Sequence, residues 1–351
     1  MKKICLIITL SFVSIFAFAQ SKKAVELTNE GVELHDKGEY AKAIAKYDEA
    51  IAEDPTYINS VYEKTLTLFN MKKYDECIVL SKKVIKDFPD NKLLKGVYVQ
   101  YGSCLDELGN GKQAIKIYDE GLKVFPNYFL LNFNKGITYL IMQDNKKATD
   151  AFQAALIDNP FHSSSYYRIA DQFRNSNHIP TMLSCIMYLM VENKSSRADE
   201  VHNALLKLMY DGVKKTGENA TTITMDASMF DTKKDKKDVD NFRSSELLFK
   251  LSSASDKDSV LSNTVKTDIE KFDFKLQLLI NSMIDDGNGF FKERYVPFFK
   301  KLKEKGFTMI VSRLVFKVKN DERNSAWLKT NTGKVDAFYD WLQKYKWPTK
   351  E

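Results

Sequence analysis

Four of the seven prolines in this chain recur at nearly constant spacing, and this recurrence constrains the fold more than any other feature. Pro55, Pro89, Pro126 and Pro160 are separated by 34, 37 and 34 residues. A period near 34 indicates a supersecondary unit that is repeated along the chain. Mostly small and aromatic residues stand 12, 8 and 5 positions before each proline. They are Ala43, Tyr47 and Ala50; Cys77, Ser81 and Val84; Ala114, Tyr118 and Gly121; and Ala148, Phe152 and Ala155.

Each unit has the pattern of two helices. Apolar residues follow helical spacing, and glycine-containing breaks at Gly38 and at 108–111 separate the two segments. Small residues let the two helices approach closely, so we expect the aromatic ring of the second helix to fill the space against the next unit. Because one pair cannot bury its apolar face alone, the units must stack. The positions 12 residues before each leading small residue are Gly31, Thr65, Gly102 and Gly136.

These residues resemble the tetratricopeptide repeat. The family pattern has small residues where Gly31, Ala43 and Ala50 stand, an aromatic where Tyr47 stands, and a closing proline. The second unit departs from it at Thr65, Cys77, Ser81 and Val84, and three extra residues lie within 90–95. A fifth, degenerate unit begins at 163 and has no closing proline. The resemblance covers residues 24 to about 195.

The resemblance implies a superhelix whose first helices line a concave groove for a peptide or a partner helix. Its two rows of groove positions are Thr28, Tyr62, Val99, Phe133 and Tyr167, and next to them Asn29, Glu63, Gln100, Asn134 and Arg168. Rigid aromatics beside amides and charges suit peptide capture. The alternative is that the aromatics only pack against neighbouring helices. From the two rows we select as partner-binding residues Asn29, Tyr62, Glu63, Gln100, Phe133, Asn134, Tyr167 and Arg168.

One specialised version of the family is excluded by the residue types. Chaperone-adaptor members clamp a C-terminal carboxylate with basic and amide side chains. The corresponding positions here hold Thr28, Val32, Glu63, Gly96 and Gln100, which include no cation. Glu63 would repel a carboxylate.

The N-terminus has the layout of a secretory signal peptide. A basic start at 1–3 precedes an apolar run from 4 to 19 that ends Ala17-Phe18-Ala19. The run is short for a membrane span of about 20 residues, so we expect cleavage rather than a retained anchor. We therefore predict a periplasmic or secreted protein with no stable membrane anchor. Without residues 1–19 the formal charge falls from +6 to +4, which does not call for a nucleic-acid partner.

The second half is less regular. Residues 181–192, 200–210 and 272–283 have helical apolar spacing, 290–302 is rich in aromatics, and we interpret 307–318 as a buried helix rather than a strand. Residues 214–240 are polar and mark a linker. Residues from Trp327 to Tyr345 form one apolar helical stripe.

The second half also carries a candidate polymer-binding region. Nine lysines and arginines but only two glutamates lie between Lys292 and Lys319. With Trp327, Trp341 and Trp347 they form a basic, aromatic region that could bind an anionic or glycan envelope polymer. The simpler interpretation is the solvated face of a helix.

Catalysis has little support in the sequence. The four histidines form no His-x-x-x-His pair, and there is no nucleophile motif. No cysteine spacing resembles a metal site, and no cofactor is expected. Cys77, Cys104 and Cys185 are an odd number and do not form a disulfide framework, although a Cys77–Cys104 bridge stays open.

The sequence as a whole predicts an all-α protein: a tetratricopeptide solenoid followed by a helical C-terminal domain. We expect an exported, non-catalytic module for protein–protein interaction or scaffolding in the cell envelope. The alternative is a binding module for anionic or glycan polymers. The predicted segments are a signal peptide (1–19), four repeats (24–57, 58–94, 95–128 and 129–162), a degenerate repeat with a helical pair (163–213), a polar linker (214–240) and a helical domain (241–351).

Overall fold

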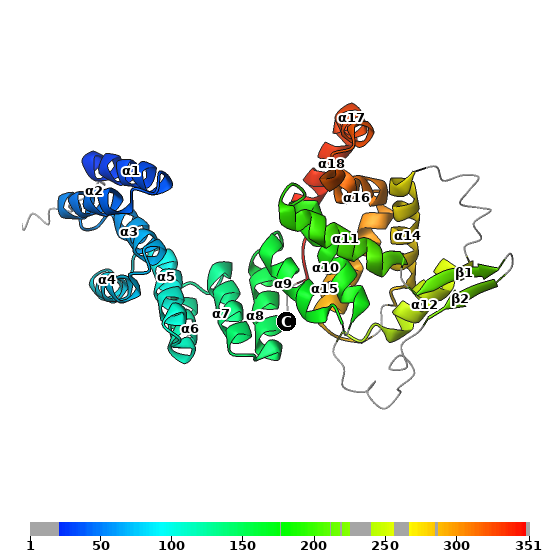
Figure 1. The fold of residues 1–351 in the computed structure, drawn as a ribbon, viewed down its shortest axis with the longest axis horizontal. Coiled ribbons are helices and arrows are strands. Elements are labelled where there is room, and N and C mark those ends of the chain that lie inside the picture. The colour runs from blue at the N-terminus through cyan, green and yellow to red at the C-terminus, as the bar shows by residue number, and fades with distance from the viewer. Residues whose placement is uncertain are drawn as a thin grey trace, which may run out of the picture. The chain divides into compact units, whose positions relative to one another are not determined.

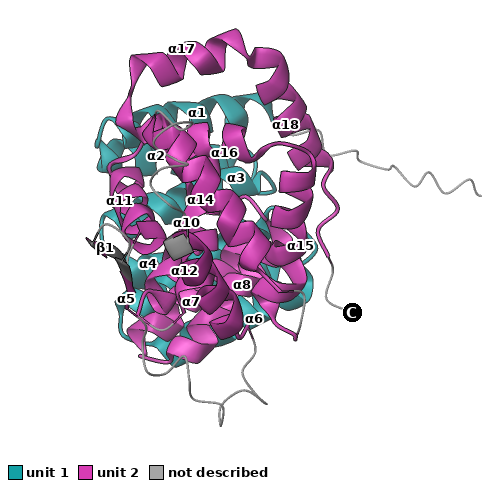
Figure 2. Cartoon of the chain, turned by 90° about the vertical axis from the view of Figure 1, so that its right-hand side faces the viewer, with its two compact units in different colours: residues 1–125 teal, residues 126–351 magenta. Residues whose placement is uncertain are grey.

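The computed structural model describes residues 21–175, 177–210, 212–217, 220–224, 240–255, 267–284 and 287–348 (Figure 1). The predicted signal peptide lies outside these residues. The chain divides into two compact units, 1–125 and 126–351, which Figure 2 shows in two colours. We describe each unit by itself.

The first unit consists of three helical pairs, as the proline spacing predicts. A longer connection joins the second pair to the third, where the three extra residues lie. The helices are α1 (Lys22–Asp36), α2 (Tyr40–Glu53), α3 (Ile58–Asn70), α4 (Tyr74–Asp87), α5 (Leu94–Glu107) and α6 (Gly111–Val124).

Glycines hold the two helices of a pair close together. A β-carbon on Gly31 would overlap the ring of Tyr47, and one on Gly102 would overlap the ring of Tyr118. Both rings are fully buried. Each ring lies on the first helix of its own pair, in the gap that the glycine leaves. Tyr47 also reaches Thr67 of α3 in the next pair, in line with the expectation that the ring fills the space against the next unit. In the second pair Thr65 takes the place of the glycine and is also fully buried.

The turn inside each of the first four pairs has one residue in the left-handed conformation. In the first and third pairs this residue is Gly38 or Gly109, each with φ of 76°. The second pair places Lys72 there with φ of 59°, and the pair that opens the second unit places Gln143 there with φ of 61°. For residues other than glycine this backbone conformation is sterically unfavourable.

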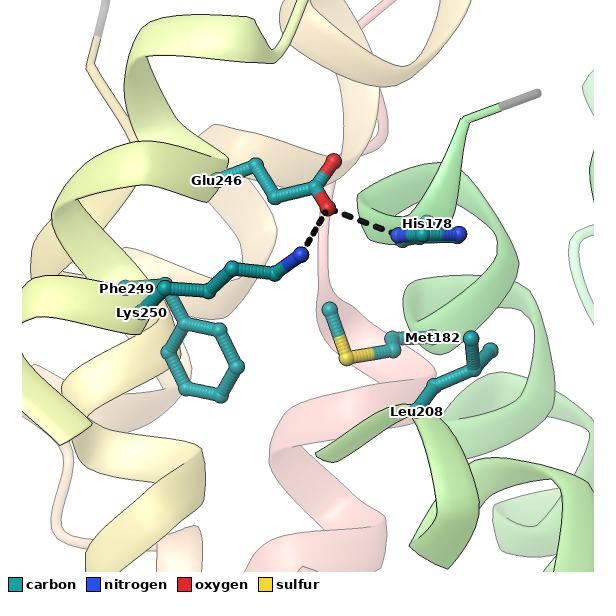
Figure 3. Close-up of a pocket in the computed structure, with 6 residues that line it drawn as sticks. All are labelled: His178, Met182, Leu208, Glu246, Phe249 and Lys250. Atoms are coloured by element: carbon teal, nitrogen blue, oxygen red, sulfur yellow. Dashed lines mark hydrogen bonds and ion pairs between the residues drawn. The ribbon is translucent and has the colours of Figure 1, made fainter. Parts of the chain in front are cut away.

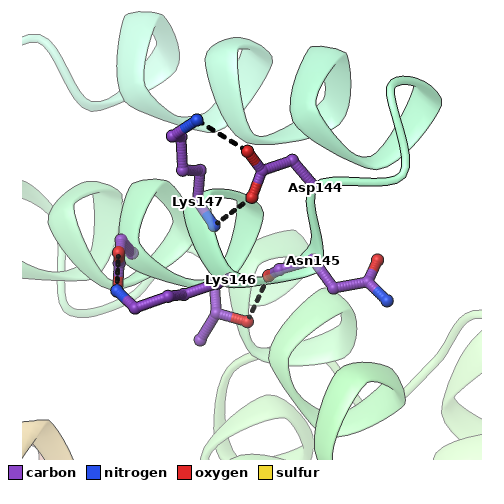
Figure 4. Close-up of polar contacts among 6 residues, drawn as sticks. Asp144, Asn145, Lys146 and Lys147 are labelled. Carbon is purple, nitrogen blue, oxygen red and sulfur yellow. Dashed lines mark hydrogen bonds and ion pairs between the residues drawn. The ribbon is translucent and has the colours of Figure 1, made fainter.

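Asp144 starts the helix after one of these turns (Figure 4). Its carboxylate accepts a hydrogen bond from the Lys147 backbone N–H (3.2 Å) and forms an ion pair with the Lys147 ammonium (2.7 Å). Lys146 pairs with Asp150 one turn further on, at 2.9 Å. Such a cap satisfies N–H groups that have no partner within the helix.

The second unit contains the remaining helices and a short β-ribbon. Its helices are α7 (Phe129–Ile141), α8 (Asn145–Asp158), α9 (Ser163–Phe173), α10 (His178–Val191), α11 (Ser196–Tyr210), α12 (Arg243–Ser255), α14 (Asp268–Ser282), α15 (Phe290–Glu304), α16 (Thr308–Val315), the 3₁₀ helix Phe316–Lys319, α17 (Glu322–Thr330) and α18 (Thr332–Lys344).

One hydrophobic core joins the last repeats to the C-terminal helices. It includes Phe152 and Tyr166 from the repeats and Tyr295 and Phe298 from α15. The Tyr166 and Tyr295 hydroxyls are hydrogen-bonded at 2.7 Å in the buried interior. The domain boundary predicted at 214–240 is therefore wrong, because the repeats from residue 126 onward belong to the same compact unit as the C-terminal half.

Helix α10 explains why this boundary fails. Every residue from Ile179 to Met190 is buried. A helix that is apolar all round must be covered on all sides. Neighbouring α9 and α11 cover part of α10, and α16 packs against it as well.

The expected polar linker begins with structure of its own. Strands β1 (Val213–Gly217) and β2 (Ala220–Ile223) pair antiparallel, with Val213 opposite Ile223. The ribbon packs against α12. β-branched residues favour strands, and they occur here among lysines that mask the pattern. Most of the remaining linker, 225–239, lies outside the described residues. Apart from this ribbon, the predicted all-α fold is confirmed.

The C-terminal stripe is interrupted. Asn331 ends α17 and precedes α18, and its side-chain amide donates to the Trp327 carbonyl at 3.0 Å. Tyr345 lies beyond the end of α18. The single helix expected from Trp327 to Tyr345 is therefore two helices, because a local side-chain bond to the backbone competes with helix continuation.

A buried arginine attaches the last residues to the repeats. Arg294 of α15 is 5% exposed. It donates to the Pro348 carbonyl at 2.7 Å and to the Leu156 carbonyl at 3.3 Å, near the end of α8. Its guanidinium also lies 5.0 Å from the centre of the Trp347 ring. Carbonyls at a helix C-terminus favour a cation.

Candidate partner-binding surfaces

The two predicted rows of groove residues differ in what they do. They lie on the first helix of each pair: α1, α3 and α5 in the first unit, α7 and α9 in the second. Although the rows are adjacent in sequence, their side chains point to different surroundings.

The row with the aromatics packs between helices. The Thr28 hydroxyl donates to the Ala24 carbonyl and hydrogen-bonds Ser60 of α3 at 2.8 Å. Tyr62 lies over Gly96 of α5, where a β-carbon would be 2.6 Å from the ring. Phe133 contacts the rings of Phe152 and His162, with centroids 5.6 and 4.7 Å apart. For Tyr62 and Phe133 the packing alternative therefore describes the structure.

The polar row is less engaged. Asn29 is exposed, and the other four members are half-buried. The Gln100 side-chain oxygen is buried without a hydrogen-bond partner in the part of the chain that the structure describes. Asn134 donates to the carbonyl of Leu130 in its own helix, at 2.8 Å. These side chains can still bond to a bound segment.

Glu63 gives the first unit an anionic position in this row. Burial, followed by the charge of Asp36, raises the pKa of the Glu63 carboxyl. Among the described residues no lysine, arginine or histidine lies within 4.0 Å of it. A half-buried carboxylate without a counter-ion is a favourable position for a donor from a partner.

The second unit has a cationic counterpart. Arg168 of α9 and Arg197 of α11 both lie near the Tyr167 ring, at 5.8 and 4.7 Å from its centre. Tyr167 also contacts the Tyr188 ring of α10 at 6.3 Å. The sequence analysis did not find Arg197, because it stands 29 positions after Arg168 and outside the repeat register.

A small pocket elsewhere in the second unit gathers three ionisable groups (Figure 3). His178 Nδ1 lies 2.6 Å and Lys250 Nζ 3.2 Å from the same oxygen of Glu246. Burial opposes ionisation of Glu246, but His178 and Lys250 together lower its pKa. The pocket offers about 20 Å³ to water-sized molecules, which is room for about one water. Met182, Leu208 and Phe249 form the rest of the lining.

Two other histidines lie within the packing of the chain. His202 is fully buried; its Nδ1 hydrogen-bonds the Val315 carbonyl at 3.0 Å. His35, in the predicted groove, is hydrogen-bonded to Thr67 and Asn70 at 2.7 and 3.0 Å. Among the described residues, no group of His, Cys, Asp and Glu could hold a metal ion. Within the same residues, no helix combines the length and hydrophobicity that crossing a membrane requires.

The C-terminal tryptophan rings pack against other side chains of the protein. Trp341 and Trp347 both stack on Phe298, with centroids 5.4 and 4.7 Å apart. The Arg313 guanidinium lies 4.0 Å from the centre of the Trp327 ring. In the basic stretch, Lys301 pairs with Glu304 at 2.9 Å and Lys303 contacts Asn281. These contacts are typical of a packed helix with a solvated outer face.

The cysteines are free thiols in this structure. Cys77, Cys104 and Cys185 are all buried. A hydrogen bond with Cys104 lowers the pKa of the Cys77 thiol, and the same contact together with burial raises that of Cys104. The two thiols of the first unit therefore touch without a bridge.

Comparison with known proteins identifies the repeat. Residues 96–128 match the model of the tetratricopeptide repeat family. Residues 96–128 are a tetratricopeptide repeat. The prediction of tetratricopeptide repeats is therefore confirmed. The pairs with Gly31 and Pro55 and with Gly136 and Pro160 share the glycine and proline register of this repeat. No curated protein matches the chain.

Several solved structures are similar to about half of the chain. One is a tetratricopeptide protein of Thermus thermophilus, at 18% identity and a TM-score of 0.44, covering 52% of this chain and 99% of that one. Another is Pseudomonas aeruginosa pilF, at 15% identity and 0.45, covering 54% and 90%. A third is YrrB, described as a tetratricopeptide protein with an unusual peptide-binding site, at 17% identity and 0.35, covering 48% and 86%.

Proposed function

We propose that this chain is a non-catalytic interaction module in which each unit, by itself, holds an extended peptide or a helix of a protein partner on the polar residues of its own tetratricopeptide helices. The observation that carries the proposal is the separation of the two rows. Tyr62 and Phe133 are used to hold helices together, whereas Asn29, Glu63 and Gln100 keep bonding capacity for a ligand.

The polar row supplies the chemistry that peptide recognition needs. Amides such as Gln100 and Asn134 can bond to both the N–H and the C=O of an extended backbone. Glu63 and Arg168 add charge selectivity.

The place of action is part of the same proposal. The basic start, apolar run and small residues of 1–19 support export to the periplasm or beyond the cell. We expect the mature chain to begin at Gln20. Mass spectrometry of the protein purified from a cell-envelope fraction tests this; an intact mass that still includes residues 1–19 would contradict it.

Affinity capture from a cell-envelope extract tests the binding function. The variant Asn29→Ala/Glu63→Ala/Gln100→Ala removes the polar row of the first unit and leaves Tyr62 on Gly96. The matched control Lys83→Ala/Asp87→Ala/Gln113→Ala changes three exposed residues on second helices. Both variants should unfold at the wild-type temperature by circular dichroism.

We expect one protein to be enriched by the wild type and the control and lost by the polar-row variant. Equal capture by all three chains would contradict the proposal. Changing Tyr62 or Phe133 to alanine is unsuitable here, because lost packing would be mistaken for lost binding.

A further inference from the structure

Two arginines from different helices meet at one tyrosine ring in the second unit. Arg168 follows Tyr167 in α9, and Arg197 is the second residue of α11. Both guanidiniums lie within 6 Å of the Tyr167 ring centre. Arg197 is exposed, and Arg168 is half-buried. Together they place two positive charges beside one tyrosine ring.

The carboxylates of the residues around this tyrosine ring form hydrogen bonds or ion pairs with other side chains. Glu200 lies 3.5 Å from Arg174 and accepts a hydrogen bond from the Tyr167 hydroxyl at 3.4 Å. Arg174 also pairs with Asp171 at 3.5 Å. Glu192 accepts a hydrogen bond from the Ser163 hydroxyl at 2.8 Å, and its pKa is lowered by a hydrogen bond with Ser195 and, among smaller causes, by the charge of Arg197. In the described part of the chain, no carboxylate lies within 4.0 Å of Arg168 or Arg197.

The ring prepares both guanidiniums for an anion. A guanidinium above an aromatic ring is held in place and keeps its N–H edge free. Such an edge binds a carboxylate with two parallel hydrogen bonds, which are charge-assisted and geometrically selective. Because Tyr167 fixes both arginines, little side-chain entropy is lost when a ligand binds.

We infer that Tyr167, Arg168 and Arg197 form a carboxylate-binding site for acidic side chains of the partner segment. The inference rests on the proposed function and names the chemistry of the partner at this point of the polar row. Two guanidiniums match two neighbouring aspartates or glutamates. The site differs from the first unit, where Glu63 disfavours a carboxylate.

A phage-displayed library of random peptides, selected on the full-length chain, tests the inference. Binders are then synthesised and measured by fluorescence anisotropy. We expect adjacent acidic residues among the selected peptides. Replacing those residues with their amides should weaken binding at least tenfold, while amidation of the peptide C-terminus should leave it unchanged. The peptide with the amidated C-terminus shows whether the site binds side-chain carboxylates or the carboxylate of the chain end.

Variants of the chain assign the site. Arg168→Gln and Arg197→Gln should each weaken binding of the acidic peptide about tenfold, a typical effect of losing one charge-assisted bond. Arg197→Lys should also weaken it, because an ammonium cannot bond a carboxylate in two places. The matched control is Arg174→Gln, an arginine already paired with Asp171 and Glu200, which should change binding less than twofold.

Other outcomes overturn the inference and separate it from the proposed function. The inference is overturned if the selected peptides lack acidic residues, or if Arg168→Gln and Arg197→Gln leave their binding unchanged. If the variant Asn29→Ala/Glu63→Ala/Gln100→Ala abolishes binding of the same peptides, the proposed function still stands and only the inference fails. Binding that is limited to a sulfated or phosphorylated polymer also overturns it. A library that yields no binder overturns the inference; the proposed function is then judged by capture of a whole protein.

Discussion

A β-carbon on Gly136 would lie 2.6 Å from Cε1 of Phe152, so the ring occupies the space that any other residue would need. The same relationship joins Gly31 to Tyr47 and Gly102 to Tyr118. The glycine and the ring are 16 residues apart in each case. This contact fixes the spacing of the two helices in a tetratricopeptide pair.

The first prediction concerns this contact. Gly136→Ala should lower the free energy of unfolding by about 2 kcal/mol, because the added methyl displaces a fully buried ring from a well-packed core. Urea unfolding followed by circular dichroism measures the loss. The control Gly333→Ala lies in α18 with no atom within 4 Å of the added carbon, so it should be neutral or slightly stabilising.

The second prediction concerns the left-handed turns. Lys72→Gly and Gln143→Gly should each stabilise the chain by about 1 kcal/mol, since a side chain in this conformation costs about that much. Gly38→Ala should have the opposite sign; its added carbon meets no neighbour, so backbone strain alone acts there. Thermal unfolding of the three variants gives the comparison. A lower melting temperature for Lys72→Gly would show that the turn is held by side-chain contacts instead.

The third prediction concerns pH. Burial lowers the pKa of His162 to about 4. The imidazole is therefore neutral when folded but takes up a proton on unfolding below its ordinary pKa of 6.5. Its contribution to stability is full above about pH 6.5 and is lost as the pH falls towards about 4. Allowing for the solvent that reaches the ring, we expect this loss to be about 2 kcal/mol.

Unfolding free energies of the wild type and His162→Gln between about pH 7.5 and 4.5 test this effect. The difference between the two chains isolates His162 from the other titrating groups. The wild type should lose more stability than the variant on acidification. Parallel curves would mean that the His162 ring, which packs on Phe129 and Phe133, titrates normally.

The fourth prediction concerns the tail. Arg294→Lys should destabilise the second unit by about 2 kcal/mol, because lysine keeps the charge but cannot reach the carbonyls of Leu156 and Pro348 at once. Tryptophan fluorescence should shift to the red as Trp347 loses its cover. Arg323→Lys is the control; that side chain is 91% exposed, and its substitution should change neither signal.

The repeats could be predicted because their determinants are local and periodic. Proline and glycine act through the backbone at their own positions and do not depend on distant residues. Pro126 and Gly102 therefore identified the unit that the family model matches. The groove was harder. Tyr62 and Glu63 are neighbours in sequence, and only the position of Gly96, 34 residues later, decides that one packs and the other stays available.

Other features depended on partners far away in the chain. The run from Ile179 to Met190 indicated burial, but not that helices beyond residue 267 supply the cover. Arg197 has no motif of its own and gains its meaning only from Tyr167. Asn331 interrupts the last helices through a single side-chain bond, which apolar spacing does not reveal.

The all-round burial of α10 also decides where the gene can be cut. A fragment chosen from the repeat pattern alone would stop near residue 213 and would lack α16, which packs against α10. Such a product would form inclusion bodies. A fragment from 126 to 348 keeps the helices that bury α10 and the hydrogen bond from Arg294 to the Pro348 carbonyl. We expect this fragment to express in soluble form.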